Sequence, residues 1–298
     1  MAHADRPELG DGPRRSPIVQ IFLNPGSGSY SSDRIRALHD AFAAHGATVI
    51  QTVCTAELPV IAENVDHVCI AGGDGTVREI VSAVARSGRS IDLGIYPMGT
   101  INLLAREGLY PSDPRIFVRR MFAGDPPRSH FPVAIGDRLF FVCASVGPDS
   151  AAVAQLSPRL KRLFGRLAYA IAFCPVLLDW PRRRIRLEVD GQALDCEAFY
   201  LAKGRYFAGP WSFAPRAAVD QPVLHLVAFA RMARRDFLAF VWALMRARPI
   251  ERLKGVTCMT CTALSAESEA ALPVQADGDI VGTLPIGIRL GETALRFR

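Results

Sequence analysis

The sequence lacks a long apolar run and an N-terminal signal segment. Its first sixteen residues, MAHADRPELGDGPRRS, are polar and contain no apolar stretch of the kind found in secretory signals. A helix that spans a bilayer needs about 20 apolar residues, whereas the run LAYAIAFCPVLL at 167–178 is shorter and contains a proline. We therefore expect a mobile tail over residues 1–16 and a cytoplasmic protein that can also lie peripherally at the inner membrane surface.

Paired cysteines and the common nucleotide-binding fingerprints are also missing. The seven cysteines are odd in number and lie mostly inside apolar stretches, which favours reduced core thiols over a disulfide framework. Cys258 and Cys261 form one CxxC pair, but zinc usually takes four ligands. The loop after the first strand has no Walker A lysine, and Ser31 stands where GxGxxG requires its third glycine. No aromatic–glycine RNA-binding motif occurs, so we expect no nucleic-acid partner.

The length of the chain bears on the number of its domains, and its charge bears on the kind of partner it binds. A chain of 298 residues suggests two domains or one large one, and its 50% hydrophobic content allows a sizeable core. The formal net charge is +6 and the pI is about 9.1. A basic balance suits an anionic partner such as a nucleotide or an acidic lipid. A basic balance is also common in proteins of GC-rich genomes, so the charge can reflect either an anionic partner or genome composition.

The first half of the sequence alternates predicted strands with predicted helices. Apolar runs predict strands, and apolar residues at helical spacing predict helices. The strands cover 18–23, 47–53, 65–71 and 91–96, and the helices cover 33–46 and 76–87. Such alternation predicts a parallel sheet with helices on both faces. Ligands of such sheets bind beyond the carboxyl ends of the strands.

The second half of the sequence, from about residue 131, has a different pattern. Residues 184–202 alternate polar and apolar side chains across an Asp-Gly pair, which predicts a hairpin. Further strand-like runs lie at 139–146, 223–229, 256–263 and 286–297, and helices are predicted at 158–179 and 232–247. The second half is therefore expected to be mostly antiparallel β, with the boundary between residues 123 and 132.

Three loops rich in glycine and hydroxyl residues follow predicted strands. They are Asn24-Pro25-Gly26-Ser27-Gly28-Ser29, Gly72-Gly73-Asp74-Gly75-Thr76 and Pro97-Met98-Gly99-Thr100-Ile101-Asn102. The second is either a tight turn with a helix cap or an anion site, since glycine lets a ligand approach the backbone and a helix N-terminus offers free N–H groups. Because all three lie at one edge of the predicted sheet, a shared phosphate ligand explains them together.

These loop sequences resemble those of a known family. NPGSG, GGDGTVREI and PMGTINLLAR, in this order and spacing, are similar to the catalytic domain of the diacylglycerol kinase and sphingosine kinase superfamily, and to its soluble bacterial lipid kinases in particular. The resemblance spans residues 18–298 and includes CASVGPDS (143–150), GRLAYAI (165–171), FAGPWSFAP (207–215) and ADGD (276–279). The middle loop is shared with NAD kinases and, more loosely, with phosphofructokinases, whereas the other segments favour lipid kinases.

The resemblance implies a fold and a cofactor. It implies an α/β nucleotide-binding domain with a parallel sheet over 17–130 and an antiparallel β-sandwich for the lipid substrate over 131–298. The active site would lie between them, and the last strand can return to the first domain. It implies ATP binding by Asn24, Pro25, Gly26, Ser27, Gly28, Thr55, Gly72, Gly73, Asp74, Gly75, Thr76, Glu79, Gly99, Thr100 and Asn102.

The resemblance also implies an acidic catalytic group and Mg²⁺. It assigns the general base to Asp277, the acidic position two residues later to Asp279, and a place in the metal–water network to Asp149. Asp74, in its glycine loop, is suited to reach the metal or an acceptor hydroxyl. By residue type alone, Asp277-Gly278 is equally a hairpin turn sequence, and Asp149 is equally a helix cap.

The sequence departs from the family at three positions. Many relatives have Asn-Asp where this chain has Asn102-Leu103, so one acidic member of the network is missing. Relatives with a structural Mg²⁺ carry an Asp-Gly-x-Leu-Asp run, and here Gln221 and His225 replace two expected carboxylates. These replacements argue against a retained structural metal.

Two basic stretches, residues 158–184 and 230–254, interleave arginine or lysine with apolar residues. They are either helices that bind an anionic membrane surface or core helices with a solvated basic face. The expected partners are a nucleotide and a lipid at a membrane surface, and a homodimer is left open. Two other functions also stay open: an NAD kinase-like small-molecule kinase, and a non-catalytic nucleotide- or lipid-binding protein on the same scaffold.

Overall fold

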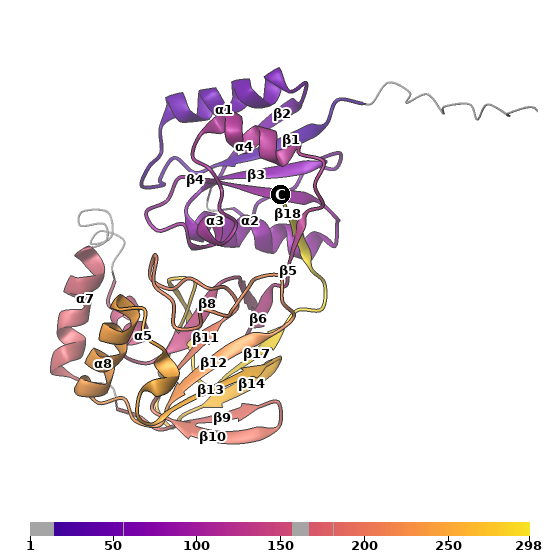
Figure 1. Cartoon of the computed structure of the whole chain (residues 1–298). Coiled ribbons are helices and arrows are strands. Elements are labelled where there is room, and N and C mark those ends of the chain that lie inside the picture. Colours follow the sequence, from indigo (N-terminus) through magenta and orange to yellow (C-terminus); the bar gives the residue numbers. More distant parts are fainter. Residues whose placement is uncertain (1–14, 56, 157–166, 181) are drawn as a thin grey trace, which may run out of the picture.

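The computed structural model describes residues 15–55, 57–156, 167–180 and 182–298 (Figure 1). The predicted tail up to residue 14, and the predicted helix over 158–166, lie outside the described residues. Arg15 forms an ion pair with Asp66, 2.7 Å from nitrogen to oxygen. Among the described helices, none combines the length and apolar character needed to cross a bilayer.

A six-stranded sheet forms the centre of the first domain. Its strands are β1 (Ile18–Leu23), β2 (Thr48–Val53), β3 (His67–Gly72), β4 (Asp92–Pro97), β5 (Arg128–His130) and β18 (Leu295–Phe297), in the order β2-β1-β3-β4-β18-β5. All pairs are parallel except β18 with β5. Because helices cover both faces, β1, β3 and β4 are almost continuous buried runs.

In the described part of the chain, helices flank both faces of this sheet (Figure 1). They are α1 (Ser32–Ala44), α2 (Asp74–Ser87), α3 (Leu103–Glu107) and α4 (Pro114–Met121). α1 and α4 lie on the face away from the second domain, and α2 and α3 lie on the face toward it. The prediction for α2 was wrong at its start, because Gly73 is the extended N-cap residue and Asp74 to Thr76 form the first helical turn.

The second domain consists of two packed antiparallel sheets. One contains β6 (Val133–Ile135), β7 (Arg138–Phe140), β9 (Ile185–Val189), β10 (Gln192–Cys196), β14 (Ala263–Glu267) and β17 (Ile286–Leu290). The other contains β8 (Cys143–Val146), β11 (Ala198–Ala202), β12 (Leu224–Phe229), β13 (Val256–Cys261), β15 (Pro273–Ala276) and β16 (Asp279–Thr283). Their inner faces share one apolar core. The predicted fold class, an α/β domain with a parallel sheet followed by an antiparallel β-sandwich, is confirmed.

Several predicted strand runs were wrong as single strands, because the chain bends and changes sheets within them. The run 256–263 divides at Thr262 into β13 and β14. The hairpin predicted within 184–202 is confirmed as β9 and β10, and only the end of that stretch passes into the other sheet, as β11. The runs 139–146 and 286–297 divide into β7 and β8, and into β17 and β18. Asp190 holds one corner, since its carboxylate accepts the N–H groups of Thr262 and Ala263.

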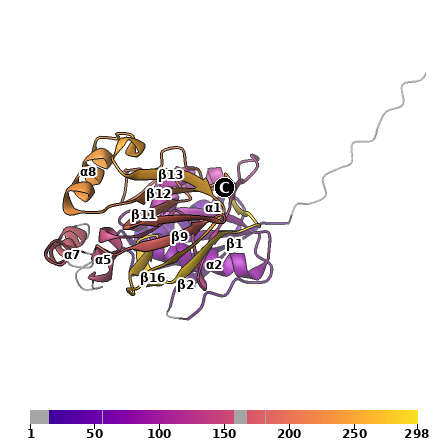
Figure 2. The ribbon, with the colours of Figure 1, turned by 90° about the horizontal axis from the view of Figure 1, so that it is seen from below.

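The described helices of the second domain lie on one side of the sandwich. They are α5 (Pro148–Ala154), α7 (Leu167–Leu178), α8 (Arg234–Met245) and the 3₁₀ turn η1 (Ile250–Arg252). Figure 2 shows α5, α7 and α8 together on this side. The inner face of α8 is held by aromatic contacts, because the Phe240 ring lies 4.7 Å from Tyr200 and 5.1 Å from Phe229, centroid to centroid.

The chain passes between the two domains twice. It leaves the first domain after β5, and it returns after β17 to place β18 between β4 and β5. The buried carboxylate of Asp92 in β4 binds Arg296 Nε at 2.6 Å and Arg298 Nε at 2.5 Å. The two crossings join the domains, and the ion pairs anchor the returning strand β18 in the first sheet.

Candidate active site

The three glycine-bearing loops lie together at the carboxyl edge of the first sheet. They follow β1, β3 and β4, which are consecutive neighbours in the sheet. Asn24 Nδ2 donates to Thr76 Oγ1 at 2.7 Å, which joins the first loop to the second. Ser29 Oγ donates to the carbonyl oxygen of Gly99 at 3.3 Å, which joins the first loop to the third. The loops therefore form one continuous surface.

Glycine is required where these loops touch. A Cβ on Gly99 would lie 2.5 Å from the Cα of Gly73, and a Cβ on Gly28 would lie 2.9 Å from Thr100 Oγ1. Such distances are shorter than atoms tolerate, so any larger residue would push the loops apart. Gly99 and Gly73 therefore allow close packing of backbone against backbone, and Gly28 leaves room for the Thr100 side chain.

The N-terminus of α2 lies in the middle of this surface and has no side-chain cap. Within the described residues no side-chain capping hydrogen bond is made at its first turn, and the N-cap residue Gly73 is extended. The buried Ser27 Oγ nearby in the first loop has no hydrogen-bond partner within the described residues, whereas Pro25 and Gly26 are exposed at the tip of that loop. Free N–H groups and the positive end of a helix dipole favour an anion such as phosphate.

Asp74 holds the third loop in place. Its Oδ2 accepts the N–H of Asn102 at 2.9 Å, and its Oδ1 accepts the N–H of Leu103 at 2.6 Å. The Asn102 side chain closes the turn, bonding the N–H and carbonyl oxygen of Gly99 at 2.8 Å each, in a left-handed conformation with φ 55°. Burial, and then the negative charge of Asp277, raise the pKa of Asp74 to about 6. Asp74 is thus a positioning residue as well as an acidic one.

Asp277 lies in the turn between β15 and β16. Its carboxylate accepts the backbone N–H groups of Phe141 at 2.7 Å, Val142 at 2.9 Å and Cys143 at 3.0 Å. Burial raises the pKa of this carboxyl group, while the three hydrogen bonds and the charge of Arg78 act in the opposite direction. A carboxylate offers about four acceptor positions, so one remains open on Oδ2 for a proton or a hydroxyl group.

Residues 276–279 of the second domain contact α2 of the first. Arg78 Nη1 lies 2.8 Å from Asp279 Oδ2 and 3.4 Å from the carbonyl oxygen of Ala276. A Cβ on Gly75 would lie 3.7 Å from the same Asp279 oxygen. Sequence reasoning missed Arg78, although it lies one helical turn after Asp74 within GGDGTVREI and could have been found by its spacing.

Asp149 belongs to the same acidic group. Ser145 Oγ donates to its Oδ2 at 2.5 Å, whereas its buried Oδ1 makes no hydrogen bond of normal geometry in the described part of the chain. Burial raises the pKa of Asp149, while the Ser145 hydroxyl and the nearby Tyr200 hydroxyl act in the opposite direction. The pKa of the Cys143 thiol is raised by burial and by the charges of Asp277, Asp149 and Asp74, so all three carboxylates are near enough to act on this thiol.

This arrangement fits Mg²⁺. Asp149 Oδ1 is an unpaired buried oxygen, and Asp74 and Asp277 repel one another when ionised. Mg²⁺ in phosphate sites uses one or two carboxylates, substrate phosphates and water. In the described ranges no three histidine, cysteine or acidic side chains converge on a metal position, so phosphate oxygens would have to complete the coordination.

The segment 218–225 does not fit a structural Mg²⁺. Lys203 is fully buried, and its ammonium donates to the carbonyl oxygens of Ala218, at 3.2 Å, and Gln221. A positive charge is therefore already bonded to the backbone that precedes His225, where relatives place a carboxylate. Sequence reasoning missed Lys203, which interrupts the apolar run FYLAKGRYF.

Two predicted ATP-binding residues are not drawn into the loop surface. Thr55 is exposed after β2, and its hydroxyl accepts the N–H of Glu57 at 3.3 Å in a local turn. Glu79 is exposed on α2, and its charge helps raise the pKa of Cys54. Among the described residues, neither side chain hydrogen-bonds to the three loops.

Comparisons with known proteins match both halves of the chain. Residues 19–128 match the family model of the diacylglycerol kinase catalytic domain, and residues 143–297 match that of the YegS C-terminal NAD kinase beta sandwich-like domain. A diacylglycerol kinase of Staphylococcus carnosus is 26% identical over 230 residues, 76% of this chain and 74% of the relative. One from Staphylococcus aureus (strain JH9) is 27% identical over 228 residues, 75% of this chain and 71% of the relative.

A solved structure shares the fold. The crystal structure of a candidate diacylglycerol kinase from Bacillus anthracis (strain Sterne) has a TM-score of 0.77 and 18% sequence identity, covering 98% of this chain and 99% of that one. The two family models confirm the resemblance read from the loops. The chain belongs to the diacylglycerol kinase-like family that joins a diacylglycerol kinase catalytic domain to a YegS-type β-sandwich domain.

Proposed function

We propose that this protein is an ATP- and Mg²⁺-dependent lipid kinase that phosphorylates a hydroxyl group of a membrane lipid such as diacylglycerol. The observation that carries the proposal is the contact between the domains: Asp277 and Asp279 of the sandwich lie against the uncapped N-terminus of α2. An anion site facing buried carboxylates suits phosphoryl transfer, in which positioning and charge neutralisation provide most of the catalysis. The names of the relatives support a lipid as the acceptor.

Each group has a role in this proposal. The N–H groups of α2 and of the neighbouring loops bind the phosphates of ATP, and glycine keeps the backbone accessible. Mg²⁺, when bound, neutralises charge on the phosphates beside Asp74 and Asp149. Asp277, fixed by three backbone N–H groups, accepts the proton of the lipid hydroxyl on the open position of Oδ2. A general base of this kind contributes about 10²- to 10⁴-fold.

A non-catalytic binding protein is the second candidate. Two observations favour it: both Asp277 oxygens already accept backbone N–H groups, and Leu103 is buried where many relatives have a carboxylate. Such a protein would bind the nucleotide through the same loops and transfer nothing.

Transfer of radiolabelled phosphate from ATP tests the proposal. The purified protein would be offered Mg²⁺, ATP and vesicles of single lipids, with NAD as a separate acceptor. We expect a phosphorylated lipid, about 10²- to 10⁴-fold slower turnover in Asp277→Asn, and unchanged ATP binding. Asp137→Asn, at an exposed aspartate in a turn, is the matched control.

The outcomes separate the candidates. ATP binding without turnover on any lipid would favour the non-catalytic protein. Phosphorylated NAD without a lipid product would favour a small-molecule kinase. Full activity of Asp277→Asn would remove Asp277 from the role of base.

A further inference from the structure

The outward faces of α7 and α8 expose large apolar side chains. Leu178 at the end of α7 is 86% exposed, and Leu238 and Trp242 on α8 are 65% and 49% exposed. Leu177 and Met245 are exposed as well. We call these five residues the α7–α8 patch. Exposed apolar groups gathered in this way mark interaction sites on soluble proteins.

The patch is built on two helices that touch one another. The Phe173 ring of α7 stacks on the Phe237 ring of α8 at 4.9 Å between centroids, and Trp180 packs against both. This aromatic contact fixes the two outward faces relative to one another. Figures 1 and 2 both show α7 and α8 side by side at the edge of the second domain.

α8 is apolar on more faces than its packing uses. Residues 237–245, FLAFVWALM, contain nine consecutive uncharged side chains. Phe240, Ala243 and Leu244 are buried in the domain. Leu238, Trp242 and Met245 follow at helical spacing on the opposite side, where nothing in the described chain covers them. Packing against the domain core therefore accounts for the apolar side chains on only one side of this helix.

Arginines are frequent in the segments that end α7 and form α8. The segments 177–184 and 231–248 contain eight arginines and two aspartates, Asp179 and Asp236, and ion pairs join Arg184 to Asp195 and Arg235 to Asp236. Arg182 is paired with Glu197, and Arg234 donates to the last carbonyl oxygens of α7. Arg246 lies 4.6 Å over the Trp242 ring.

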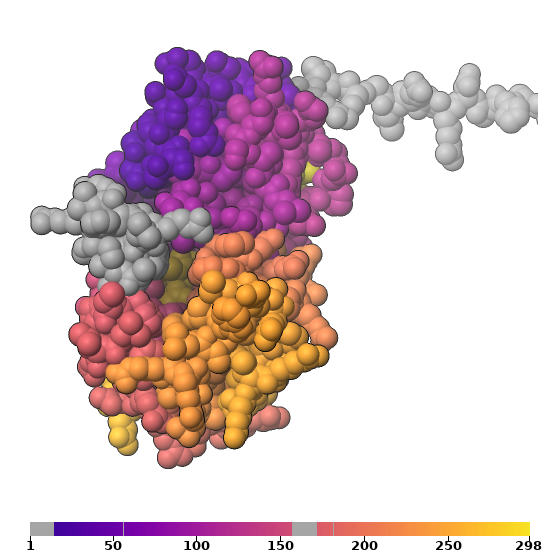
Figure 3. Space-filling model, turned by 60° about the vertical axis from the view of Figure 1, so that its left-hand side comes forward, coloured from indigo at the N-terminus to yellow at the C-terminus, as the bar shows by residue number. Residues whose placement is uncertain are grey.

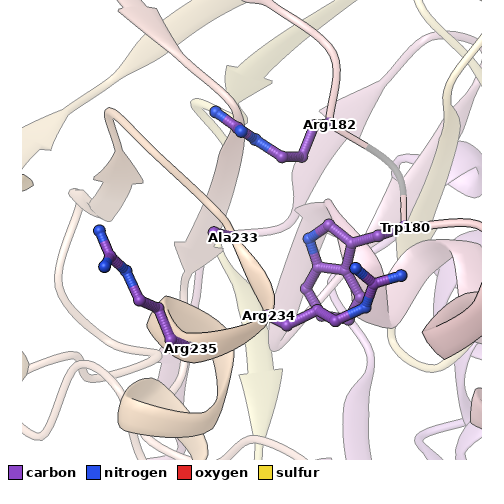
Figure 4. Close-up of a pocket in the computed structure, with 5 residues that line it drawn as sticks. All are labelled: Trp180, Arg182, Ala233, Arg234 and Arg235. Carbon is purple, nitrogen blue, oxygen red and sulfur yellow. The ribbon is translucent and has the colours of Figure 1, made fainter.

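An open cavity of about 510 Å³ lies where α7 ends and α8 begins, lined by Trp180, Arg182, Ala233, Arg234 and Arg235. Figure 4 shows the guanidinium groups of Arg182 and Arg235 extending to the same side of the cavity, with Arg234 beside the Trp180 ring. Arginine is well suited to bind phosphate oxygens. The cavity therefore places cationic groups next to the apolar patch.

We propose that the α7–α8 patch is the surface that docks this protein on an anionic phospholipid bilayer, with the apolar side chains in the interface and the arginines at the lipid phosphates. This assignment rests on the proposed function, because a lipid kinase must reach its substrate in a membrane. Apolar area together with basic charge is the combination that binds anionic membranes. A second copy of this chain is disfavoured, since its equally positive face would be repelled.

The placement of the patch suits delivery of a lipid. In Figure 3 the surface between the two domains is hollowed, and α7 and α8 lie below that hollow on the same side of the molecule. A bilayer against α7 and α8 would lie on the side of the molecule where this hollow opens.

Sedimentation with vesicles tests the proposal. The full chain would be mixed with vesicles of pure phosphatidylcholine or of phosphatidylcholine with phosphatidylglycerol. We expect binding to the anionic vesicles only, and about tenfold weaker binding of the double variant Leu238→Ser, Trp242→Ser. The matched control is Leu58→Ser, Val60→Ser, whose native side chains are 80% and 76% exposed on the first domain.

Further measurements keep the two proposals apart. Unchanged phosphorylation of a dispersed short-chain diacylglycerol by the double variant would show that docking, and not the catalytic group, was altered. Wild-type protein that ignores anionic vesicles, or a double variant that binds them like wild type, would overturn the docking surface. A wild-type dimer that the double variant dissociates would assign the patch to a second copy instead. Vesicle binding without turnover on any lipid would leave docking in place and defeat the proposed kinase.

Discussion

Replacing Lys203 by methionine should change the pH dependence of stability. Lys203 is 0% exposed, and its ammonium donates to two backbone carbonyl oxygens. Burial lowers its pKa from 10.5 to about 8, although the charges of Asp220 and Glu107 act in the opposite direction. Methionine has a similar length and no donor, so both carbonyl oxygens lose their partner.

The sign of the effect follows from the direction of the pKa shift. Between pH 8 and 10.5 the unfolded chain binds a proton at Lys203 that the folded chain has released, so the free energy of unfolding rises with pH in this window. The shift corresponds to at most about 3 kcal/mol, and we expect about 1–2 kcal/mol after screening by solvent. A neutral lysine still donates two hydrogen bonds, so the variant should lose most relative to wild type at high pH.

Urea unfolding of wild type and Lys203→Met at pH 7, 8, 9 and 10 measures this difference. The wild type should gain about 1–2 kcal/mol over the variant from pH 7 to pH 10. Lys254→Met, at an exposed lysine, should show no such trend. A difference between wild type and Lys203→Met that stays constant across this range would refute the buried, shifted ammonium.

Three further predictions concern the metal, the loops and the acid range. EDTA should leave the thermal unfolding midpoint unchanged in the absence of nucleotide, because the Lys203 ammonium supplies the positive charge at the segment 218–225. A lower midpoint would indicate a bound structural metal. Gly99→Ala should weaken ATP binding about tenfold or more with an unchanged circular dichroism spectrum, since its Cβ would lie 2.5 Å from the Cα of Gly73; equal affinity in calorimetry would contradict this packing. The pKa of Asp74 is raised from 3.8 to about 6. Between these pH values the folded chain binds a proton that the unfolded chain has released, so stability falls as pH rises through this window. Asp74→Asn should remove about 2 kcal/mol of that pH dependence in urea unfolding, and an unchanged slope would argue against the shift.

The sequence allowed the architecture of the first domain to be predicted. Its strands are local apolar runs, and the edge where parallel strands end follows from their order, so the meeting of the three loops could be foreseen. The helix α4 also had a signal that went unused, because Asp113 followed by Pro114 is typical of a helix start, and Asp113 Oδ1 accepts the Ile116 N–H at 2.9 Å.

Other features depend on contacts between distant residues. Side chains alternate between the two faces of a strand, and this alternation continues where the chain bends. The division at Thr262 between two sheets therefore left no trace in the sequence. Lys203 could be noticed as a charge in an apolar run, but its carbonyl partners come from a segment 15 and 18 residues away. The restraint of Asp277 by three N–H groups from residues 141–143 likewise required the folded sandwich.

The strand β18 has a consequence for how the first domain can be made. A fragment that ends near residue 130 would contain β4 and β5 but not the strand that lies between them. Its Asp92 would be left without Arg296 and Arg298. During synthesis the chain must therefore be made as far as β18 before the first domain can complete its sheet, which makes the two halves a single folding unit rather than exchangeable modules.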